Sequence, residues 1–372
     1  MQAIQCIRDW GQSLWYDNLR RDLLGSGELA RWIAGGISGV TANPTILEQA
    51  IVETHDYDSA IRTWARRMPS AETLYETLVW EDIRQVADLL QPVYSQTEGH
   101  DGFVSLEVPP SLAYDTAGTV REAHRLFAAL DRPNIMIKVP ATPEGIVALE
   151  RLVADGINVN VTLIFSVGVY HHVIDAYEAG LIARHARGLP LDRVASVASF
   201  FVSRVDAAVD PWIRDGGFDS SWLGKVGIAN AKNAYQLFDS RFHGQRFAPL
   251  LGAGAQVQRP LWASTKPKNH GYPGTMYVQS LIGAETVNTL SPSTLEALPS
   301  INVWHRTIDQ NLEESRQILE DVADAGLSLE VVGQGLLEAG LSTFTHSFDR
   351  LLATLQQRLS QRSNAHGEGS HV

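Results

Sequence analysis

A single lysine lies inside a stretch of the chain that otherwise has the pattern of a buried β-strand. The stretch is NIMIKVPAT, residues 134–142, and alternation along it places apolar residues on both faces, as in a parallel strand covered on both sides. Lysine is rarely buried without a partner, because removing its ammonium group from water is costly. Lys138 is therefore either an exposed residue of an edge strand or a residue that is used for chemistry.

Other polar residues stand near the ends of further apolar runs. With Lys138, they supply carboxylates for proton transfer, and amides and hydroxyls that bind a polyol, beside an amine nucleophile. The combination indicates Schiff-base chemistry on a sugar. The set comprises Asp17, Asn43, Glu107, Asn160, Thr162, Ser199 and Ser264.

Most of these residues, taken singly, also have a structural interpretation. Asp17 has the setting of a capping or turn residue, and Asn43 precedes a proline in a common turn signal. Thr162 and Ser199 fit ordinary strand hydroxyls that bond to nearby backbone. The functional interpretation therefore requires a fold that brings these residues together around Lys138.

Eight short apolar runs alternate with longer stretches of helical periodicity, which predicts βα repeats and a parallel sheet. Eight such units indicate a (β/α)₈ TIM barrel, an α/β fold in which catalytic groups gather at the carboxyl ends of the strands. The clearest helical stretches are residues 69–90 and 223–242. The predicted strands are residues 13–19, 36–43, 103–108, 135–139, 157–165, 195–202, 259–264 and 286–290.

The spacing of the polar residues predicts extra helices. The steps between markers on successive strands, from Asp17 to Ser264, are 26, 64, 31, 24, 37 and 65 residues, and the two long steps leave room for inserted helices. After the last strand, SPSTLEAL predicts a helix with a serine cap and a first-turn proline, and helical patterns continue to about Leu359. We expect these helices to cover one end of the barrel. Residues 1–361 are interpreted as one domain, and the polar residues 362–372 as a frayed tail.

The bulk composition is that of a globular protein and argues against several functional classes. Of 372 residues, 44% are hydrophobic and 19% are charged, and the net charge of −12 disfavours a general attraction to nucleic acid or anionic membrane. No signal-like segment and no apolar span of about 18 residues is present, so we expect a cytoplasmic protein that does not bind membranes. Cys6 is the single cysteine, which excludes an internal disulfide and a cysteine-based zinc cluster.

Five motifs, in the same order along most of the chain, resemble those of the transaldolases, in their longer bacterial subfamily. The resemblance implies a (β/α)₈ fold and transfer of a dihydroxyacetone unit from sedoheptulose 7-phosphate to glyceraldehyde 3-phosphate in the pentose phosphate pathway. It implies sugar phosphates as partners and no cofactor, while a monomer and a homodimer both remain open. The motifs are GVTANPT (39–45), IMIKVPAT (135–142), INVNVTLIFS (157–166), VASFFVSRVD (197–206) and WASTKPKN (262–269).

The resemblance assigns the two central groups. Lys138 matches the lysine that forms an imine with the ketose carbonyl. Its apolar surroundings disfavour the ammonium form, which leaves more free amine to attack. Asp17 matches the general acid/base that takes the proton of the C4 hydroxyl as the C3–C4 bond breaks.

The remaining strand-end residues receive supporting roles from the same resemblance. Glu107 and Thr162 match a pair that holds a catalytic water for imine formation and hydrolysis. Asn43 and Asn160 match residues that hold the dihydroxyacetone unit, and Ser199 matches a residue that bonds its hydroxyl.

Phosphate recognition is assigned to a second group of residues. Arg204 matches the family's phosphate-binding arginine, whose planar guanidinium suits phosphate oxygens, although a surface ion pair is the structural alternative. Ser264 matches a phosphate-side serine. Lys266 stands where some relatives have an arginine, whereas others have a lysine two positions on, where this chain has Lys268. The sequence leaves open which lysine meets the phosphate, and each also fits a solvated loop residue.

Neither a metal nor a nucleotide is predicted. We expect His171 and His172 to be structural, because adjacent helical residues point apart and no carboxylate was expected at useful spacing from both. Gly333 and Gly335 fall within a helical pattern, without the strand and spacing of a nucleotide loop.

Two alternative functions follow from the same residues. One is a related fructose-6-phosphate-type aldolase that releases free dihydroxyacetone; such relatives tend to have tyrosine at the position of Phe201, so the phenylalanine favours transfer. The other is a sugar-phosphate-binding regulator without catalysis. Retention of Lys138, Asp17 and Glu107 argues against that alternative.

Overall fold

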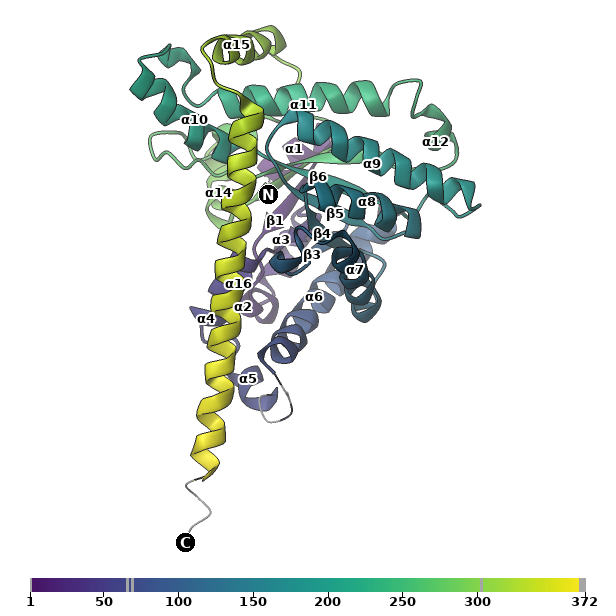
Figure 1. Ribbon diagram of the computed structural model, residues 1–372, viewed down its shortest axis with the longest axis vertical. Coiled ribbons are helices and arrows are strands. Elements are labelled where there is room, and N and C mark those ends of the chain that lie inside the picture. The colour runs from purple at the N-terminus through teal and green to yellow at the C-terminus, as the bar shows by residue number, and fades with distance from the viewer. Residues whose placement is uncertain (1, 65–66, 68–69, 302–303, 368–372) are drawn as a thin grey trace.

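The computed structural model describes residues 2–64, 67, 70–301 and 304–367, with side chains as far as Ser360. Its strands form a closed parallel barrel in the order β1 to β8 (Figure 1). This confirms the predicted (β/α)₈ TIM barrel. The strands are β1 (Gln12–Asp17), β2 (Gly39–Thr41), β3 (Phe103–Glu107), β4 (Ile135–Pro140), β5 (Val159–Ile164), β6 (Ser196–Phe201), β7 (Gln258–Ala263) and β8 (Thr286–Leu290).

Helices surround the barrel. Several begin as the sequence predicts: at Ser291, for example, the hydroxyl accepts a hydrogen bond from the Thr294 N–H, and a proline fills the first helical position. The helices are α1 (Gln2–Asp9), α2 (Arg21–Gly25), α3 (Glu28–Ala34), α4 (Pro44–Val52), α5 (Asp58–Trp64), α6 (Ala71–Gln96), η1 (Pro110–Leu112), α7 (Thr116–Leu130), α8 (Pro143–Asp155), α9 (Val167–Ala186), α10 (Ser203–Gly216), η2 (Ser220–Trp222), α11 (Val226–Phe242), α12 (Ala248–Gly252), α13 (Met276–Ser280), α14 (Pro292–Ala297), η3 (Leu298–Ser300), α15 (Leu312–Asp324) and α16 (Leu329–Gly367).

The two long steps of the sequence contain the inserted helices. Helices α4, α5 and α6 lie between β2 and β3, and α10, η2, α11 and α12 lie between β6 and β7. The predicted helix over residues 69–90 is longer than expected, since α6 continues to Gln96 and includes Pro92. None of the described helices combines the length and the apolar character needed to cross a membrane.

Alternation along the strands sorts side chains between the barrel interior and the surrounding helices. On β4, Ile135, Ile137 and Val139 pack in the larger hydrophobic cluster, which includes residues of the surrounding helices. Met136 joins a second cluster that contains Trp15 from β1 and residues of other strands. Because side chains alternate along a strand, Lys138 shares the inward face of Met136.

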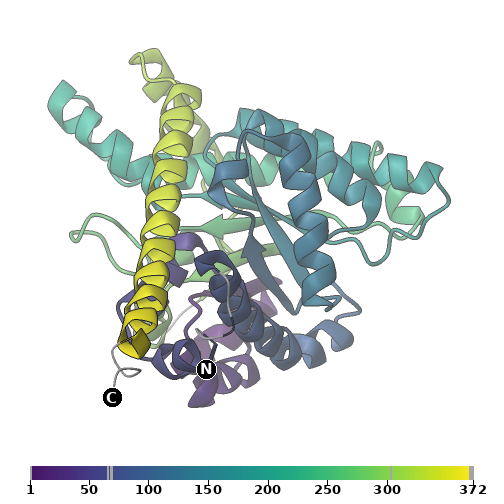
Figure 2. The same cartoon turned by 60° about the horizontal axis from the view of Figure 1, so that its bottom comes forward.

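The longest helix, α16, covers the carboxyl end of the barrel. It has 39 residues and runs along one side of the molecule in Figures 1 and 2. Thr45 and Ser347 share a hydrogen bond of 3.0 Å, which joins α16 to α4, and the Arg350 Nε donates to Glu48 Oε1 at 2.6 Å. The helix is continuous to Gly367, whereas residues 368–372 of the predicted tail lie outside the described residues, so the prediction of a frayed tail stays a prediction.

Candidate active site

Lys138 lies inside the barrel, near the carboxyl end of β4. Its residue is 5% exposed, and its Nζ lies 3.3 Å from Glu107 Oε2 and 3.5 Å from the Ala42 carbonyl oxygen. The pairing register explains the first contact, because Glu107 on β3 stands directly beside Lys138 on β4. The alternative of an exposed edge lysine is therefore wrong: β4 is paired on both sides.

The Glu107 carboxyl group is buried beside the Lys138 ammonium group. Burial raises the pKa of Glu107, the Lys138 ammonium opposes this shift, and the negative charge of Asp17 adds to it. Glu107 Oε2 makes no hydrogen bond within the described part of the chain, despite its ion pair with Lys138. Buried polar atoms are normally hydrogen-bonded, so this oxygen is able to accept a proton or bind a ligand.

Thr162 offers a second buried oxygen near the lysine. Its Oγ1 also lacks a hydrogen-bond partner among the described residues, and the side chain lines the cavity that contains Lys138. The register of β5 with β6 shifts between Val161 and Ile164, and Leu163 has a φ of 61°. Such bulges redirect side chains at functional sites, and positive φ is costly for a branched residue, so this strand end is specialised.

Asp17 and Asn43 each accept a hydrogen bond within the fold and also line the cavity around Lys138. Asp17 ends β1, and its Oδ1 accepts a hydrogen bond of 2.7 Å from Thr41 Oγ1. Asn43 caps α4, since its Oδ1 accepts from the Ile46 N–H at 3.0 Å. Both residues nevertheless line the cavity around Lys138. A cap uses only the oxygen of Asn43, so its amide nitrogen remains available to a ligand.

Asn160 and Ser199 form part of a buried chain of hydrogen bonds. Ser199 Oγ donates to Asn160 Oδ1 at 2.7 Å, and Asn160 Nδ2 donates to Ser105 Oγ at 3.0 Å. Ser199 lines the Lys138 cavity, but Asn160 is fully buried and is absent from the lining. In this arrangement Asn160 orients Ser199. Direct contact of Asn160 with a ligand stays a prediction.

One cavity of about 160 Å³ brings most of the predicted residues together. Glu107 lines a neighbouring cavity of about 400 Å³ instead, and Asn43 lines both. Sequence reasoning missed Thr41 and Phe344; Thr41 lies within the GVTANPT motif, whereas nothing in the local sequence marks Phe344 of α16. The residues around Lys138 are Asp17, Thr41, Asn43, Thr162, Ser199, Phe201, Arg204, Leu261, Ala263, Ser264, Thr265, Lys266, Lys268, Thr289, Ser291 and Phe344.

Three cations gather on one side of this cavity. Arg204, Lys266 and Lys268 form no ion pair within 4 Å among the described residues, while the Arg204 guanidinium lies 5.2 Å from the centre of the Phe201 ring. Burial lowers the pKa of Arg204, which Asp17 partly opposes. Desolvation and then the positive charges of Arg204 and Lys266 lower the pKa of Lys268. Like charges held together without acidic partners favour an anionic ligand.

Backbone geometry adds to this anion-binding character. Arg204 is the second residue of α10, and the first N–H groups of a helix favour negative charge. Ser264 follows β7 with a φ of 56°, and its Oγ lies 3.0 Å from Ser203 Oγ at the start of α10. A non-glycine residue in this conformation is strained, and strain of this kind gathers at functional sites.

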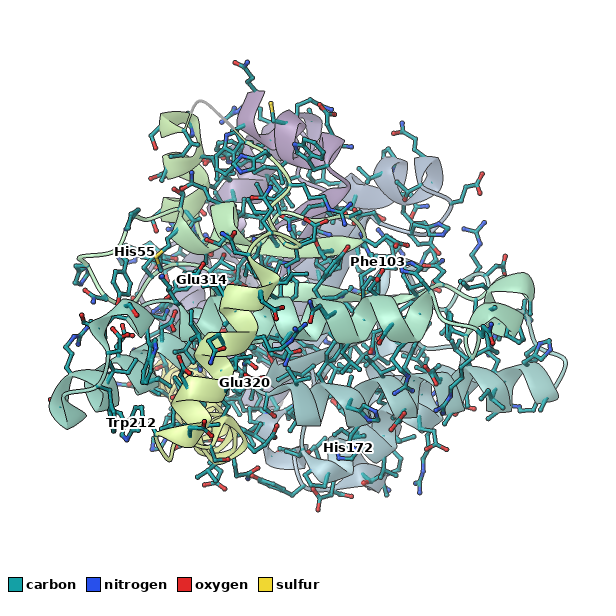
Figure 3. The ribbon with its side chains drawn as sticks, turned by 90° about the horizontal axis from the view of Figure 1, so that it is seen from above. His55, Phe103, His172, Trp212, Glu314 and Glu320 are labelled. Carbon is teal, nitrogen blue, oxygen red and sulfur yellow. The ribbon has the colours of Figure 1, made fainter. Side chains whose placement is uncertain are left out.

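A second lysine and the glycine pair lie away from this cavity. Lys225 pairs with Glu314 at 2.9 Å on the surface, where Figure 3 labels Glu314. Gly333 and Gly335 lie within α16. Neither position belongs to the lining of the Lys138 cavity.

The expectation about the histidine pair was wrong in one respect. His171, His172 and Asp175 place ligand atoms within 4.8 Å of one another, because positions three and four residues apart are neighbours on a helix. His172 is exposed on α9 (Figure 3). The Arg241 guanidinium already contacts Asp175 at 2.6 Å and His171 at 3.2 Å, so a cation at this cluster has to displace a positive charge.

Comparisons with known proteins give the family. A sequence model described as Transaldolase/Fructose-6-phosphate aldolase matches residues 14–355. A transaldolase of Thiobacillus denitrificans is 46% identical over 358 residues, which cover 95% of this chain and 100% of the relative. Those of Saccharopolyspora erythraea and Trichodesmium erythraeum are 43% and 41% identical, covering 96% and 95% of this chain and 98% and 97% of the relatives. The chain therefore belongs to the transaldolase/fructose-6-phosphate aldolase family of enzymes.

Proposed function

We propose that this enzyme transfers a dihydroxyacetone unit from sedoheptulose 7-phosphate to glyceraldehyde 3-phosphate through a Schiff base on Lys138. The observation that carries the proposal is the buried lysine, 3.3 Å from Glu107, in a cavity that also contains Asp17 and the three cations. Burial brings the Lys138 amine beside a carboxylate that can accept a proton from it, and an unprotonated lysine amine is the nucleophile in Schiff-base formation.

In the proposed reaction, the Lys138 amine adds to the C2 carbonyl of the ketose phosphate and water leaves as the imine forms. Asp17 then takes the C4 hydroxyl proton while the C3–C4 bond breaks, which releases erythrose 4-phosphate. The imine accepts the bonding electrons as an enamine. Attack of that enamine on glyceraldehyde 3-phosphate, with return of the proton, rebuilds a ketose, and hydrolysis yields fructose 6-phosphate and free Lys138.

Glu107 and Thr162 are the proposed groups that handle water in imine formation and hydrolysis. Each has a buried oxygen without a hydrogen-bond partner within the described residues, and burial raises the pKa of Glu107, which suits a carboxyl group that both gives and takes protons. Asn43 and Ser199 are the proposed contacts for the hydroxyls of the retained three-carbon unit, with Asn160 behind Ser199.

The phosphate is the proposed ligand of Arg204, Ser264 and one or both of Lys266 and Lys268. This site lies in the same cavity as Lys138, so a ketose that is covalently bound at C2 extends its distal phosphate toward the cations. Guanidinium and ammonium groups bind phosphate through charge-assisted hydrogen bonds.

Transfer is preferred over release of free dihydroxyacetone because Phe201 provides no hydroxyl at the cavity wall. Its ring packs against Phe165, with 5.0 Å between ring centres, and under Arg204. The retained enamine therefore lacks a proton donor at this position, which favours reaction with an aldose. The predictions of a cytoplasmic location and of a monomer or homodimer stay predictions.

Borohydride trapping tests the proposal. Reduction in the presence of fructose 6-phosphate, followed by peptide mass analysis, is expected to find a three-carbon adduct on Lys138. The matched control is Lys138→Met, which fills the same space without an amine and is expected to give no adduct. An adduct on another lysine, or none in the wild type, contradicts the mechanism, and the latter result favours the non-catalytic regulator.

A further inference from the structure

The segment that follows β7 carries two of the three cations but forms little regular structure. It runs from Ser264 to the start of α13 at Met276 and includes Lys266 and Lys268. A local turn, in which Asn269 Oδ1 accepts from the Gly271 N–H at 2.9 Å, does not connect it to the rest of the site. Its position relative to Arg204 therefore depends on contacts to other elements.

Ser264 and Thr265 connect the start of the segment to α10 and β8, and two tyrosines make further contacts at its other end. Tyr272, within the segment, donates its hydroxyl proton to Asp210 Oδ2 at 2.6 Å. Tyr277, at the start of α13, donates to Asp206 Oδ2 at 2.8 Å. Both acceptors lie on α10, the helix whose second residue is Arg204.

The carboxylates also connect α10 to the beginning of α11. Asp206 Oδ1 accepts from the Gly227 N–H at 2.7 Å, and Asp210 Oδ1 accepts from the Gly224 N–H at 3.0 Å. The approach is close enough to require glycine: a Cβ on Gly224 would lie 2.8 Å from the Tyr272 ring, at a backbone φ of 70°. The carboxylates therefore join α10, α11 and the cationic segment.

Burying two carboxylates one helical turn apart is costly unless they are used. Asp206 is 1% exposed and Asp210 is 3% exposed. Burial raises the pKa of Asp206 to about 7, with the charge of Asp210 adding to the shift, even though Gly227 and Tyr277 donate hydrogen bonds to it. Amide or apolar side chains at these two positions would avoid the cost of burying charge. Packing alone therefore does not explain why both positions have carboxylates that accept hydrogen bonds.

We propose that Asp206 and Asp210 are positioning residues that fix the Lys266–Lys268 segment relative to Arg204, through Tyr277 and Tyr272, and thereby set the affinity for the substrate phosphate. The inference rests on the proposed function, because it assumes that these cations bind phosphate. It assigns the two carboxylates no contact with substrate. It predicts that weakening these contacts lowers the affinity for phosphorylated ligands and leaves the affinity for unphosphorylated ones unchanged.

Tyr272→Phe is the test variant, since it removes one hydroxyl and keeps the ring on Gly224. Loss of one such hydrogen bond is expected to raise KM for fructose 6-phosphate and Kd for inorganic phosphate about five- to tenfold. The kcat and the KM for unphosphorylated fructose are expected to stay within about twofold, as in uniform loss of binding. Tyr277→Phe tests Asp206 in the same way.

Tyr177→Phe is the matched control. Tyr177 is buried, as Tyr277 is, and its hydroxyl donates to the Gln256 carbonyl oxygen at 2.9 Å, near the opposite end of the barrel. The Tyr177→Phe substitution is therefore expected to leave phosphate affinity unchanged. Phosphate affinity in Tyr272→Phe and Tyr277→Phe equal to that of a phosphate-binding wild type overturns the positioning inference and leaves the proposed function standing. A wild type that neither binds phosphate nor prefers fructose 6-phosphate to fructose overturns the inference together with the phosphate site.

Discussion

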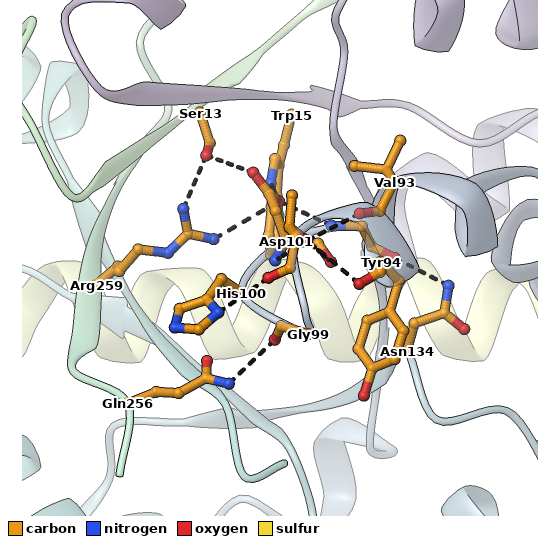
Figure 4. A network of polar contacts seen from close by, with 12 residues as sticks. Ser13, Trp15, Val93, Tyr94, Gly99, His100, Asp101, Asn134, Gln256 and Arg259 are labelled. Atoms are coloured by element: carbon orange, nitrogen blue, oxygen red, sulfur yellow. Dashed lines mark hydrogen bonds and ion pairs between the residues drawn. The ribbon is translucent and has the colours of Figure 1, made fainter. Parts of the chain in front are cut away.

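Buried charged groups at the two ends of the barrel differ in their hydrogen-bond and ion-pair partners. At the amino end, Asp101 accepts hydrogen bonds from Trp15 Nε1 at 2.8 Å and the Gly102 N–H at 3.0 Å, and it also accepts from Ser13 Oγ (Figure 4). Arg259 donates to the same serine at 2.8 Å, with its Nη2 3.6 Å from Asp101. The charged groups of this network, Asp101 and Arg259, thus have each other and Ser13 as partners.

At the carboxyl end, several of the groups expected to act on a ligand lack partners of this kind. Glu107 Oε2 and Thr162 Oγ1 are buried without hydrogen-bond partners among the described residues, and Arg204 has no carboxylate within ion-pair distance there. Leu163 and Ser264 have positive φ at the ends of their strands. The comparison indicates that one end stabilises the barrel and the other gives up stability to hold groups ready for a ligand.

Lys138→Met is the sharpest test of this difference. We expect turnover to be lost entirely, because the nucleophile is gone, while the protein stays folded, because methionine fills the space beside Met136 and Glu107, left without its counter-charge, can take up a proton. Lys225→Met, which alters an exposed ion pair with Glu314, is the control and should keep full turnover. Measurable turnover in Lys138→Met contradicts the assignment of the nucleophile.

Asp17→Ala should give the next largest effect. Loss of a general acid/base lowers turnover by about 10²–10⁴-fold, while imine formation on Lys138 continues. Rapid-mixing measurements with borohydride quenching should therefore find substrate adduct accumulating in the variant. If adduct formation and turnover decline equally, Asp17 has a structural role through its bond to Thr41 instead.

Asp101→Ala probes the amino end. Removing one partner of a buried charge pair leaves Arg259 without its carboxylate and the donors of Ser13 and Trp15 without an acceptor, so the free energy of unfolding should fall by about 3 kcal/mol. The kcat of the remaining folded enzyme should not change. Asp88→Ala, which breaks an exposed pair with Arg132, should cost about 1 kcal/mol or less by denaturant titration. A large kcat loss in Asp101→Ala would show that the two ends are functionally coupled.

Arg204→Ala tests the cations of the carboxyl end. A charge-assisted contact is worth about 1.5–3 kcal/mol, which corresponds to roughly a 10- to 150-fold rise in KM for fructose 6-phosphate with a smaller change in kcat. Fructose itself should be nearly unaffected. Lys266→Ala and Lys268→Ala, compared on the same two sugars, should identify the second phosphate ligand. An unchanged preference for fructose 6-phosphate in Arg204→Ala means that the phosphate site has been misplaced.

A final expected effect concerns pH. The pKa of Asp206 is raised from 3.8 to about 7 by burial, so the folded protein holds this proton more tightly than the unfolded chain does. The stabilisation is complete below about pH 4 and is lost as pH rises through 7, with a slope of at most about 1.4 kcal/mol per pH unit. Asp206→Asn should flatten the decline of unfolding free energy between about pH 5 and 7, relative to wild type and Asp88→Asn. An unchanged slope would exclude Asp206 as its source.

Much of the carboxyl end could be predicted because local patterns encode it. Alternation along residues 135–139 placed Lys138 on the same face as Met136, and the ends of the apolar runs marked Asp17 and Glu107. The five motifs then suggested roles for these residues, which hydrophobic periodicity alone cannot do. The spacing argument failed for Asp175, a single carboxylate that is three and four residues from the two histidines and so a helical neighbour of both.

By itself, the sequence determined the barrel, the inward lysine and the inserted helices, because strand and helix periods are local properties of the chain. Only the tertiary structure decided that Asn160 accepts a hydrogen bond from Ser199, that Phe344 of α16 lines the cavity, and that Asp210 accepts a hydrogen bond from Tyr272. Asp210 and Tyr272 are 62 residues apart, and Phe344 is farther still from Lys138. Such contacts depend on how completed elements pack in space, and neither composition nor periodicity along the chain carries that information.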